Sequence, residues 1–136
     1  MYDDGYVGVE VGRVKAADRP PAVVLGQMSE VMRELSRDAG EYSRALTENA
    51  AHKAAYEREK AKALTVLVHD YKSSGERVPG EDVRSALVAG ELDEWYSPLL
   101  ESTARVTALK ASLDVKKALL MGLQSELRVL RDEAGL

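Results

Sequence analysis

The sequence predicts an all-α fold: a long antiparallel helical hairpin with a short connector helix, packed into an oligomeric bundle or ring, after a flexible or short-strand N-terminal arm. Three observations predict it. Apolar residues recur every seven positions towards the C-terminus, a second helical period runs through the first half, and a glycine- and proline-containing break separates the two. Composition agrees, because 45% of the residues are hydrophobic but only 5% are aromatic.

The last third of the chain has the clearest period. Positions seven apart start at Leu92, and a second series lies three residues after each of them, as in the a and d positions of a coiled coil. The apolar members that should pack against other helices are Leu99, Val106, Leu109, Leu113, Leu120, Leu123, Leu127 and Leu130. Ser97 and Pro98 predict the start of this helix, as N-cap and first helical residue.

A helical period also runs from about Ala22 to Lys72. Its stripe consists of Met28, Met32, Leu35, Ala39, Tyr42 and Leu46, and it continues in steps of four through Ala50 and Ala54. Residues 25–136 should therefore form one helical hairpin domain. In residues 1–24, alternating Val and Gly and the Pro20-Pro21 pair predict an extended arm, which is either a bland flexible segment or a partner-binding tail.

The connector should begin at Ser73 and carry a short helix over residues 81–89, closed by Gly90. It also holds most of the acidic excess of a chain whose net charge is −4. If Lys72 lies opposite Pro98, Lys60 faces Lys110, and Lys53 faces Lys116 and Lys117. Trp95 and Tyr96 should pack the end of the hairpin, or alternatively contact a partner.

Self-association is expected because two helices with one apolar stripe each bury little surface. Ser102 and Lys116 are polar residues at seam positions, which can fix the register or the oligomeric state. Gly122 and Ser125 flank the seam, and their small side chains predict the close approach of another helix. The sequence therefore predicts a homo-oligomer.

Several classes of function have no support in the sequence. Cysteine is absent, so disulfides and thiolate metal sites are excluded. His52 and His69 have no further ligands at metal-site spacing, and no nucleophile or phosphate-loop motif occurs. We expect no catalytic residue, no metal and no cofactor. With no secretory signal and no apolar run that could span a bilayer, we expect a cytoplasmic protein without a membrane partner.

Two basic zones, at residues 50–62 and 105–117, could meet in the hairpin and bind phosphates. Tyr56 and Tyr71 could add base stacking. The candidate nucleic-acid contacts are Lys53, Tyr56, Arg58, Lys60, Lys62, Lys72, Arg77, Arg105, Lys110, Lys116 and Lys117. The alternative is a solvated helix face with local ion pairs.

A set of short motifs resembles small all-helical proteins of tailed phages and the UvsY-type recombination mediators. They are Tyr56, Asp70-Tyr71, Ser74-Gly75, Trp95-Tyr96, Leu123-Gln124-Ser125 and Leu130-Arg131. The resemblance covers Met28 to Gly135. It implies an oligomer that binds single-stranded DNA and helps load a recombinase onto strands covered by single-strand-binding protein. Lys60, Lys62, Lys72 and Arg77 lie in the region where that family carries basic residues.

Two functions are therefore expected from the sequence. The first is a non-enzymatic single-stranded-DNA-binding accessory protein of phage recombination or replication, with a recombinase or single-strand-binding protein as partner. The second is a coiled-coil structural, assembly or adaptor protein that binds a protein partner and no nucleic acid.

Overall fold

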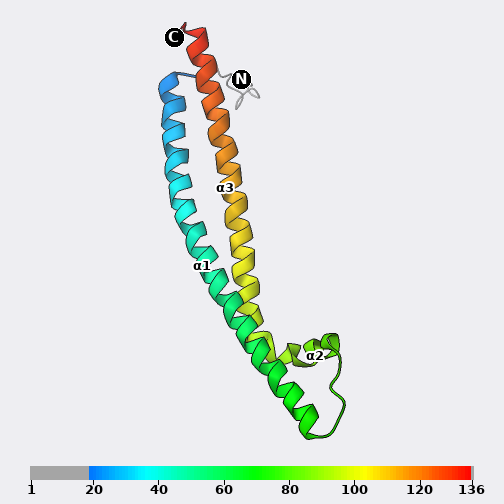
Figure 1. Ribbon diagram of the computed structural model, residues 1–136. Helices are drawn as coiled ribbons and strands as arrows, with labels where there is room; N and C mark the ends of the chain where they lie inside the picture. Colours follow the sequence, from blue (N-terminus) through cyan, green and yellow to red (C-terminus); the bar gives the residue numbers. More distant parts are fainter. Residues whose placement is uncertain (1–18, 136) are drawn as a thin grey trace, which may run out of the picture. The chain divides into compact units, whose positions relative to one another are not determined.

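The computed structural model describes residues 19–135, so most of the predicted N-terminal arm lies outside the described range. The elements are α1 (Pro21–Ser73), α2 (Glu81–Val88), the 3-10 helix η2 (Ala89–Leu92) and α3 (Asp93–Glu133). The described residues contain no strand, and the long helices α1 and α3 pack antiparallel (Figure 1). The all-α hairpin is confirmed. None of the described helices is long and apolar enough to cross a membrane.

The described chain divides into two compact units. Unit 1 contains the part of α1 up to Ala39 and the part of α3 from Ala111 onward, and unit 2 contains Gly40–Lys110. Each unit thus holds one stretch of α1 beside an antiparallel stretch of α3, and unit 2 also holds α2 and η2.

Both ends of α1 follow from local chemistry. Pro21 is the first helical residue, where its fixed φ suits the helix and its missing N–H would have no intrahelical partner. At the other end Gly75 adopts a φ of 74°. The N–H of Glu76 donates a hydrogen bond to the carbonyl oxygen of Tyr71 at 3.0 Å. The N–H of Gly75 donates one to the carbonyl oxygen of Lys72 at 3.2 Å. This is a Schellman motif, so the predicted break at the Ser-Gly turn is confirmed.

The start of the last helix differs from the prediction. α3 begins at Asp93, and Pro98 lies inside it. Pro98 lacks the N–H that would bond to the carbonyl of Glu94, so the helix loses one hydrogen bond close to its N-terminus. Asp93 and Glu94 favour the earlier start because carboxylates in a first turn interact well with the helix dipole. The helical backbone of η2 leads directly into it, so Gly90 closes no helix.

The heptad prediction for α3 is confirmed. Every a and d position from Leu92 to Leu130 is buried or half-buried, including Ser102 and Lys116. In unit 1 the leucines of α3 build the main apolar cluster with residues of α1. Its members are Val24, Val31, Leu123, Leu127 and Leu130, with Met28, Leu35 and Leu120 packed against them.

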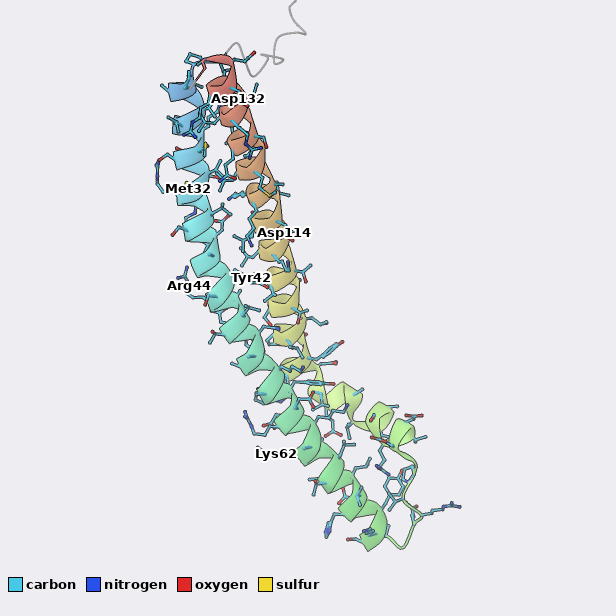
Figure 2. The ribbon with its side chains drawn as sticks, turned by 45° about the horizontal axis from the view of Figure 1, so that its top comes forward. Met32, Tyr42, Arg44, Lys62, Asp114 and Asp132 are labelled. Atoms are coloured by element: carbon cyan, nitrogen blue, oxygen red, sulfur yellow. The ribbon has the colours of Figure 1, made fainter. Side chains whose placement is uncertain are left out.

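The stripe predicted for α1 is only half right. Met28, Leu35 and Tyr42 do face inward, and Figure 2 labels Tyr42 between the two helices. The predicted members Met32, Ala39, Leu46, Ala50 and Ala54 are exposed instead. The inward positions between the correct ones are Val31, Asp38 and Ala45. A search for apolar residues alone does not select Asp38, because it does not expect an acid at a seam position.

Polar and aromatic contacts align α1 with α3 in unit 2. The Oδ1 atom of Asn49 accepts hydrogen bonds from the hydroxyls of Ser102 at 2.7 Å and Thr103 at 2.9 Å. The rings of Tyr56 and Tyr96 lie with centroids 5.3 Å apart at 45°. Near the connector, Val88 and Leu92 are buried. Tyr96 thus contacts α1 within the hairpin, but 44% of it stays exposed, so both expectations for it remain open.

Replacing Leu127 with alanine should destabilise unit 1. Leu127 is buried in the apolar cluster, so truncation leaves a cavity and should lower the free energy of unfolding by about 2–5 kcal/mol. Urea unfolding followed by circular dichroism measures the change. Leu100→Ala, on the same helix but 51% exposed, is the matched control and should cost less than about 1 kcal/mol. Equal losses would show that the cluster is not a packed core.

Candidate functional site

The basic zone of α1 is interleaved with acid. Lys53, Arg58 and Lys62 are exposed, and Lys60 is half-buried. Arg58 Nε lies 3.6 Å from a carboxylate oxygen of Glu59, and Lys62 Nζ lies 3.2 Å from the same oxygen. Two of the four cations are therefore already engaged by Glu59.

A groove beside this zone adds more acid. It has a volume of about 310 Å³ and is lined by Glu59, Lys62, Ala63, Val66, Glu91, Leu92, Glu94 and Trp95. Three carboxylates and a single ammonium group therefore share it. A phosphate backbone would be repelled by such a surface, so the groove does not suit a nucleic acid.

The basic residues of α3 lie in different settings. Arg105, Lys110 and Lys117 are exposed, whereas Lys116 is half-buried at its seam position. Arg105 lines a small groove with Glu48, His52, Pro98, Glu101 and Ser102. The basic zone of α3 is thus divided, with Lys116 in the seam and the other cations at the surface.

The predicted register between the two basic zones is wrong. It placed Lys53 opposite Lys116 and Lys117, but the α1 partners of Lys116 are Asp38 and Glu34. Lys53 lies between Asn49, which contacts Ser102, and Tyr56, which contacts Tyr96. The error arises because the connector does not simply reverse the chain. Its helical residues and the early start of α3 bring Trp95, not a residue near Lys110, beside Glu59 and Lys62.

The remaining predicted contacts are two cations at or just beyond the end of α1 and a tyrosine within its basic zone. Lys72 is exposed in the last turn of α1, and Arg77 is exposed in the connector. Tyr56 is half-buried against Tyr96, which occupies one of its edges or faces and limits stacking on a base. The structure therefore does not gather the predicted nucleic-acid contacts into one groove.

An ion cluster holds the seam of unit 1. Lys116 Nζ donates a hydrogen bond to Asp38 Oδ2 and lies 3.6 Å from a carboxylate oxygen of Glu34. Arg37 Nε lies 3.5 Å from the other oxygen of Asp38. Asp38 is the only buried charged residue in the described chain. A buried acid needs such partners, because an unpaired charge away from water is very costly.

Both members of this pair titrate away from their ordinary values. The hydrogen bond from Lys116 lowers the pKa of Asp38 below 3.8, although desolvation opposes the shift. The hydrogen bond to Asp38 raises the pKa of Lys116 above 10.5, again against desolvation. The pair is therefore fully charged throughout the neutral range.

Asp38 is the seam residue that sequence reasoning missed. The signal was present, because a lysine at a seam position requires an acid on the facing helix, and Asp38 continues the spacing of Met28, Val31 and Leu35. A second ion pair joins the ends of the seam, where Arg19 donates hydrogen bonds to Glu126 and to Gln27.

Unit 1 also exposes two uncharged helix flanks. The α1 flank consists of Leu25, Ser29, Met32, Ser36 and Ala39, all exposed. The α3 flank consists of Ala111, Val115, Ala118, Leu119, Gly122 and Val129, also all exposed. Val115 and Leu119, on adjacent turns of α3, are 68% and 52% exposed, and Met32 of α1 is 55% exposed. These exposed fractions are high for large apolar residues.

The part of the chain that the structure describes holds no cluster suited to a metal ion. No group of three His, Asp or Glu side chains there is arranged to hold a metal ion. His69 is near Ser73 at 3.4 Å, one helical turn away, and His52 lines the small groove beside Arg105.

Comparison of the chain with protein-family models, with curated proteins and with solved structures finds no match.

Replacing Asp38 with asparagine should lower the Tm at pH 7. The pKa of Asp38 is lower in the folded than in the unfolded protein, so the pair stabilises the fold above about pH 4 and this stabilisation is lost as the pH falls through the folded pKa. The pKa of Lys116 is raised, so the stabilisation is also lost at high pH, once the pH passes a folded pKa above 10.5. Thermal unfolding across this pH range measures both limits.

The matched control is Asp132→Asn, at an exposed position near the end of α3 that is labelled in Figure 2. It should leave the Tm almost unchanged. Replacing Asp38 and Lys116 together with leucine should recover the stability lost by the single substitution, because no unpaired charge then remains in the seam. A Tm deficit in Asp38→Asn that does not shrink as the pH falls would contradict this assignment.

Proposed function

We propose that the protein is a non-enzymatic helical assembly or adaptor protein that acts by binding other helices. The observation that carries the proposal is the pair of exposed uncharged flanks on α1 and α3 of unit 1. A solvated helix normally exposes charged and polar residues outside its packed stripe. Here each helix has a second stripe that is nearly free of charge, interrupted on α3 by Glu126, which is paired with Arg19, and such a stripe is typical of a helix with a second neighbour.

The glycine in the α3 flank supports the same function. A glycine inside a helix costs about 1 kcal/mol relative to alanine. A Cβ atom at Gly122 would meet no other atom within 4 Å, so nothing inside the described chain requires a glycine there. A neighbouring helix that packs closely on this flank would provide the reason.

The electrostatics favour protein contact over a nucleic-acid groove. The basic zone of α1 shares its groove with Glu59, Glu91 and Glu94, and Lys116 is bound by two acids in the seam. These contacts remove much of the positive potential that phosphate binding needs. Apolar burial against another helix does not depend on that potential.

A photo-crosslinking residue at position 115 should capture protein in the cells that make this chain. Val115 is 68% exposed in the middle of the α3 flank, so an occupant of that flank would lie within reach of the probe. The products are separated by electrophoresis and identified by mass spectrometry. The expected result is one or a few discrete protein adducts, which can include a second copy of the chain.

The same probe at exposed Glu76 in the connector is the control and should give few adducts. Equal adduct patterns at the two positions, or no protein adduct at position 115, would count against a function through these flanks.

Single-stranded-DNA binding, in the role of a phage recombination accessory, is the second candidate. One observation favours it: Lys117, Arg128 and Arg131 are exposed along one flank of α3, where they follow the same side of the helix. Exposed cations at helical spacing can track a phosphate backbone. This strip differs from the zone that the sequence predicted, since it includes only Lys117 of the predicted residues.

If this candidate is right, a labelled single-stranded oligonucleotide should bind in low salt, as measured by fluorescence anisotropy. The Lys117→Glu/Arg128→Glu variant should weaken binding and reduce the slope of log K against log salt by roughly 1.4, because about 0.7 is lost per phosphate contact. The control, Lys53→Glu, should have little effect. No binding by the unaltered protein at low salt would remove this candidate.

A further inference from the structure

We propose that two copies of this chain bind each other through α3 of unit 1, as an antiparallel helix pair with twofold symmetry. The inference rests on the proposed function and deepens it, because it names the occupant of the α3 flank as a second copy of the chain. In a twofold contact, a residue and the residue that it meets on the other copy exchange places when the copies are exchanged. A face of this kind therefore has to be complementary to itself.

The side of α3 that is turned away from α1 carries a second heptad stripe, which we call the outer stripe. Its six members follow the spacing 4-3-4-3-4, and each of them is exposed and uncharged. They are Ala111, Val115, Ala118, Gly122, Ser125 and Val129. Residues at this spacing line one face of a helix, as the a and d positions of a coiled coil do. The stripe ends in the last turns of α3, where Asp132 takes the next position.

Four large apolar residues of α3 in unit 1 stay exposed, and all of them lie on or beside the outer stripe. Val115 and Val129 belong to the stripe, Leu119 borders one edge of it, and Met121 borders the other. The buried leucines of the same helix face α1 instead. The outer stripe is thus an apolar face without a neighbour inside the described chain.

The outer stripe matches itself in one antiparallel register. With the symmetry axis at the level of Leu120, a and d positions lie opposite each other across the contact. Gly122 then meets Ala118 of the other copy in the central layer, Val115 meets Ser125, and Val129 meets Ala111. Each valine faces a small side chain and the smallest pair is at the centre, which lets two helix backbones approach closely. A glycine that nothing else in the described chain requires lies at the middle of this contact.

The apolar residues at the two edges also match in this register. Leu119 lies beside the symmetry axis and meets Leu119 of the other copy. On the other edge Met121 meets its own equivalent in the same way. Both side chains are exposed in the single chain, so the contact removes them from water against an apolar partner.

The charged residues at the edges do not oppose the contact. Asp114 lies across from Arg128 of the other copy, and Glu126 lies across from Ser112. Within its own copy Glu126 is paired with Arg19, and Asp114 also has an interaction of its own. The contact therefore needs no new ion pair, and it brings no two like charges together.

A parallel pair fits the same residues less well. In a parallel coiled coil, each edge of the stripe on one helix faces the opposite edge on the other helix. Leu119 would then lie across from Asp114, and Met121 would lie across from Glu126. Large apolar residues would thus meet carboxylates instead of each other.

Antiparallel pairs that are shifted by one heptad have a similar defect. A shift in one direction places Met121 across from Asp114, and a shift in the other direction places Val115 across from Asp132. Only the register centred at Leu120 keeps the carboxylates away from the large apolar residues.

The contact is small, so we expect a weak and reversible dimer. From Ala111 to Val129 the helix rises about 28 Å, and at a width of about 10 Å each copy contributes roughly 300–400 Å². The total is below the range of about 1,200–2,000 Å² that stable complexes bury and falls among transient contacts. The dimer should form at high micromolar concentrations and dissociate on dilution.

Sedimentation equilibrium of the full chain, at concentrations up to several hundred micromolar, tests the dimer. The unaltered chain should shift from monomer to dimer as the concentration rises. Ala118→Glu puts a charge into the central layer and should raise the Kd about tenfold or more, because the carboxylate would lose its water there. Gln124→Glu introduces the same side chain at an exposed position off the stripe and should leave the Kd unchanged within a factor of about two. Circular dichroism should show equal helix content in all three proteins.

Crosslinking tests the register. Because the chain has no cysteine, single cysteines can be introduced and joined with a short bismaleimide. Leu119→Cys should crosslink to itself, and Val115→Cys should crosslink to Ser125→Cys when the two variants are mixed. Val115→Cys alone should give little dimer, because its equivalent lies about 15 Å further along the helix axis.

Three results would each overturn the inference. They are a chain that stays monomeric at every concentration, equal dimerisation of Ala118→Glu and Gln124→Glu, and stronger self-crosslinking of Val115→Cys than of Leu119→Cys. If the chain is monomeric but the probe at position 115 still gives adducts with other proteins, the proposed function stands and only this inference fails.

Discussion

The ion pair between Asp38 and Lys116 is the constraint on which the pairing of α1 with α3 in unit 1 depends. A lysine and an aspartate at facing seam positions can satisfy each other in only one alignment, and a shift by one heptad would place both charges opposite apolar residues. The apolar residues alone do not discriminate so sharply, since leucine packs acceptably against valine or methionine at several offsets. The leucines therefore provide most of the burial, and the pair decides which residues meet. Asn49 also helps to align the two helices in unit 2, where its side-chain oxygen accepts hydrogen bonds from two neighbouring hydroxyls of α3.

The sequence was most informative where one rule acted alone. Every a and d position that the heptad predicted in α3, from Leu92 to Leu130, faces inward, because spacing along one helix is a local property. The Ser-Gly turn after α1 was equally predictable, since a left-handed residue at a helix end favours glycine. The α1 stripe was predicted less well because two stripes share Met28, Leu35 and Tyr42, and only the facing helix decides between them. The choice fell on Asp38 rather than Ala39, an outcome that depends on a lysine more than seventy residues away.

The candidate site was harder to predict, because it depends on register. A pairing error of several turns moves every cation to a new neighbour. The sequence therefore shows where basic residues are frequent, but not which other residues surround them in the fold. Lys62 lies beside Glu91 and Glu94, and Arg58 beside Glu59, which local sequence could only partly reveal. By contrast, the suggestion that Gly122 marks a helix contact came from its position outside the seam, a local feature. Met32 and Ala39, which were predicted as part of the α1 seam, lie on an exposed flank beside it, because the facing helix selects Val31 and Asp38 instead.

The uneven distribution of burial along the chain has a consequence for its motions. Between Leu46 and Leu87 no described residue is buried, whereas unit 1 contains a contiguous cluster of buried leucines and valines. The backbone amides of the last turns of α1 and of α2 are thus protected by helical hydrogen bonds with little apolar packing above them. Local opening needs less free energy where few side chains must leave a core. Hydrogen exchange should therefore be fastest around the Schellman turn and slowest near Leu123, which would make the connector end the natural entry point for unfolding and for proteases.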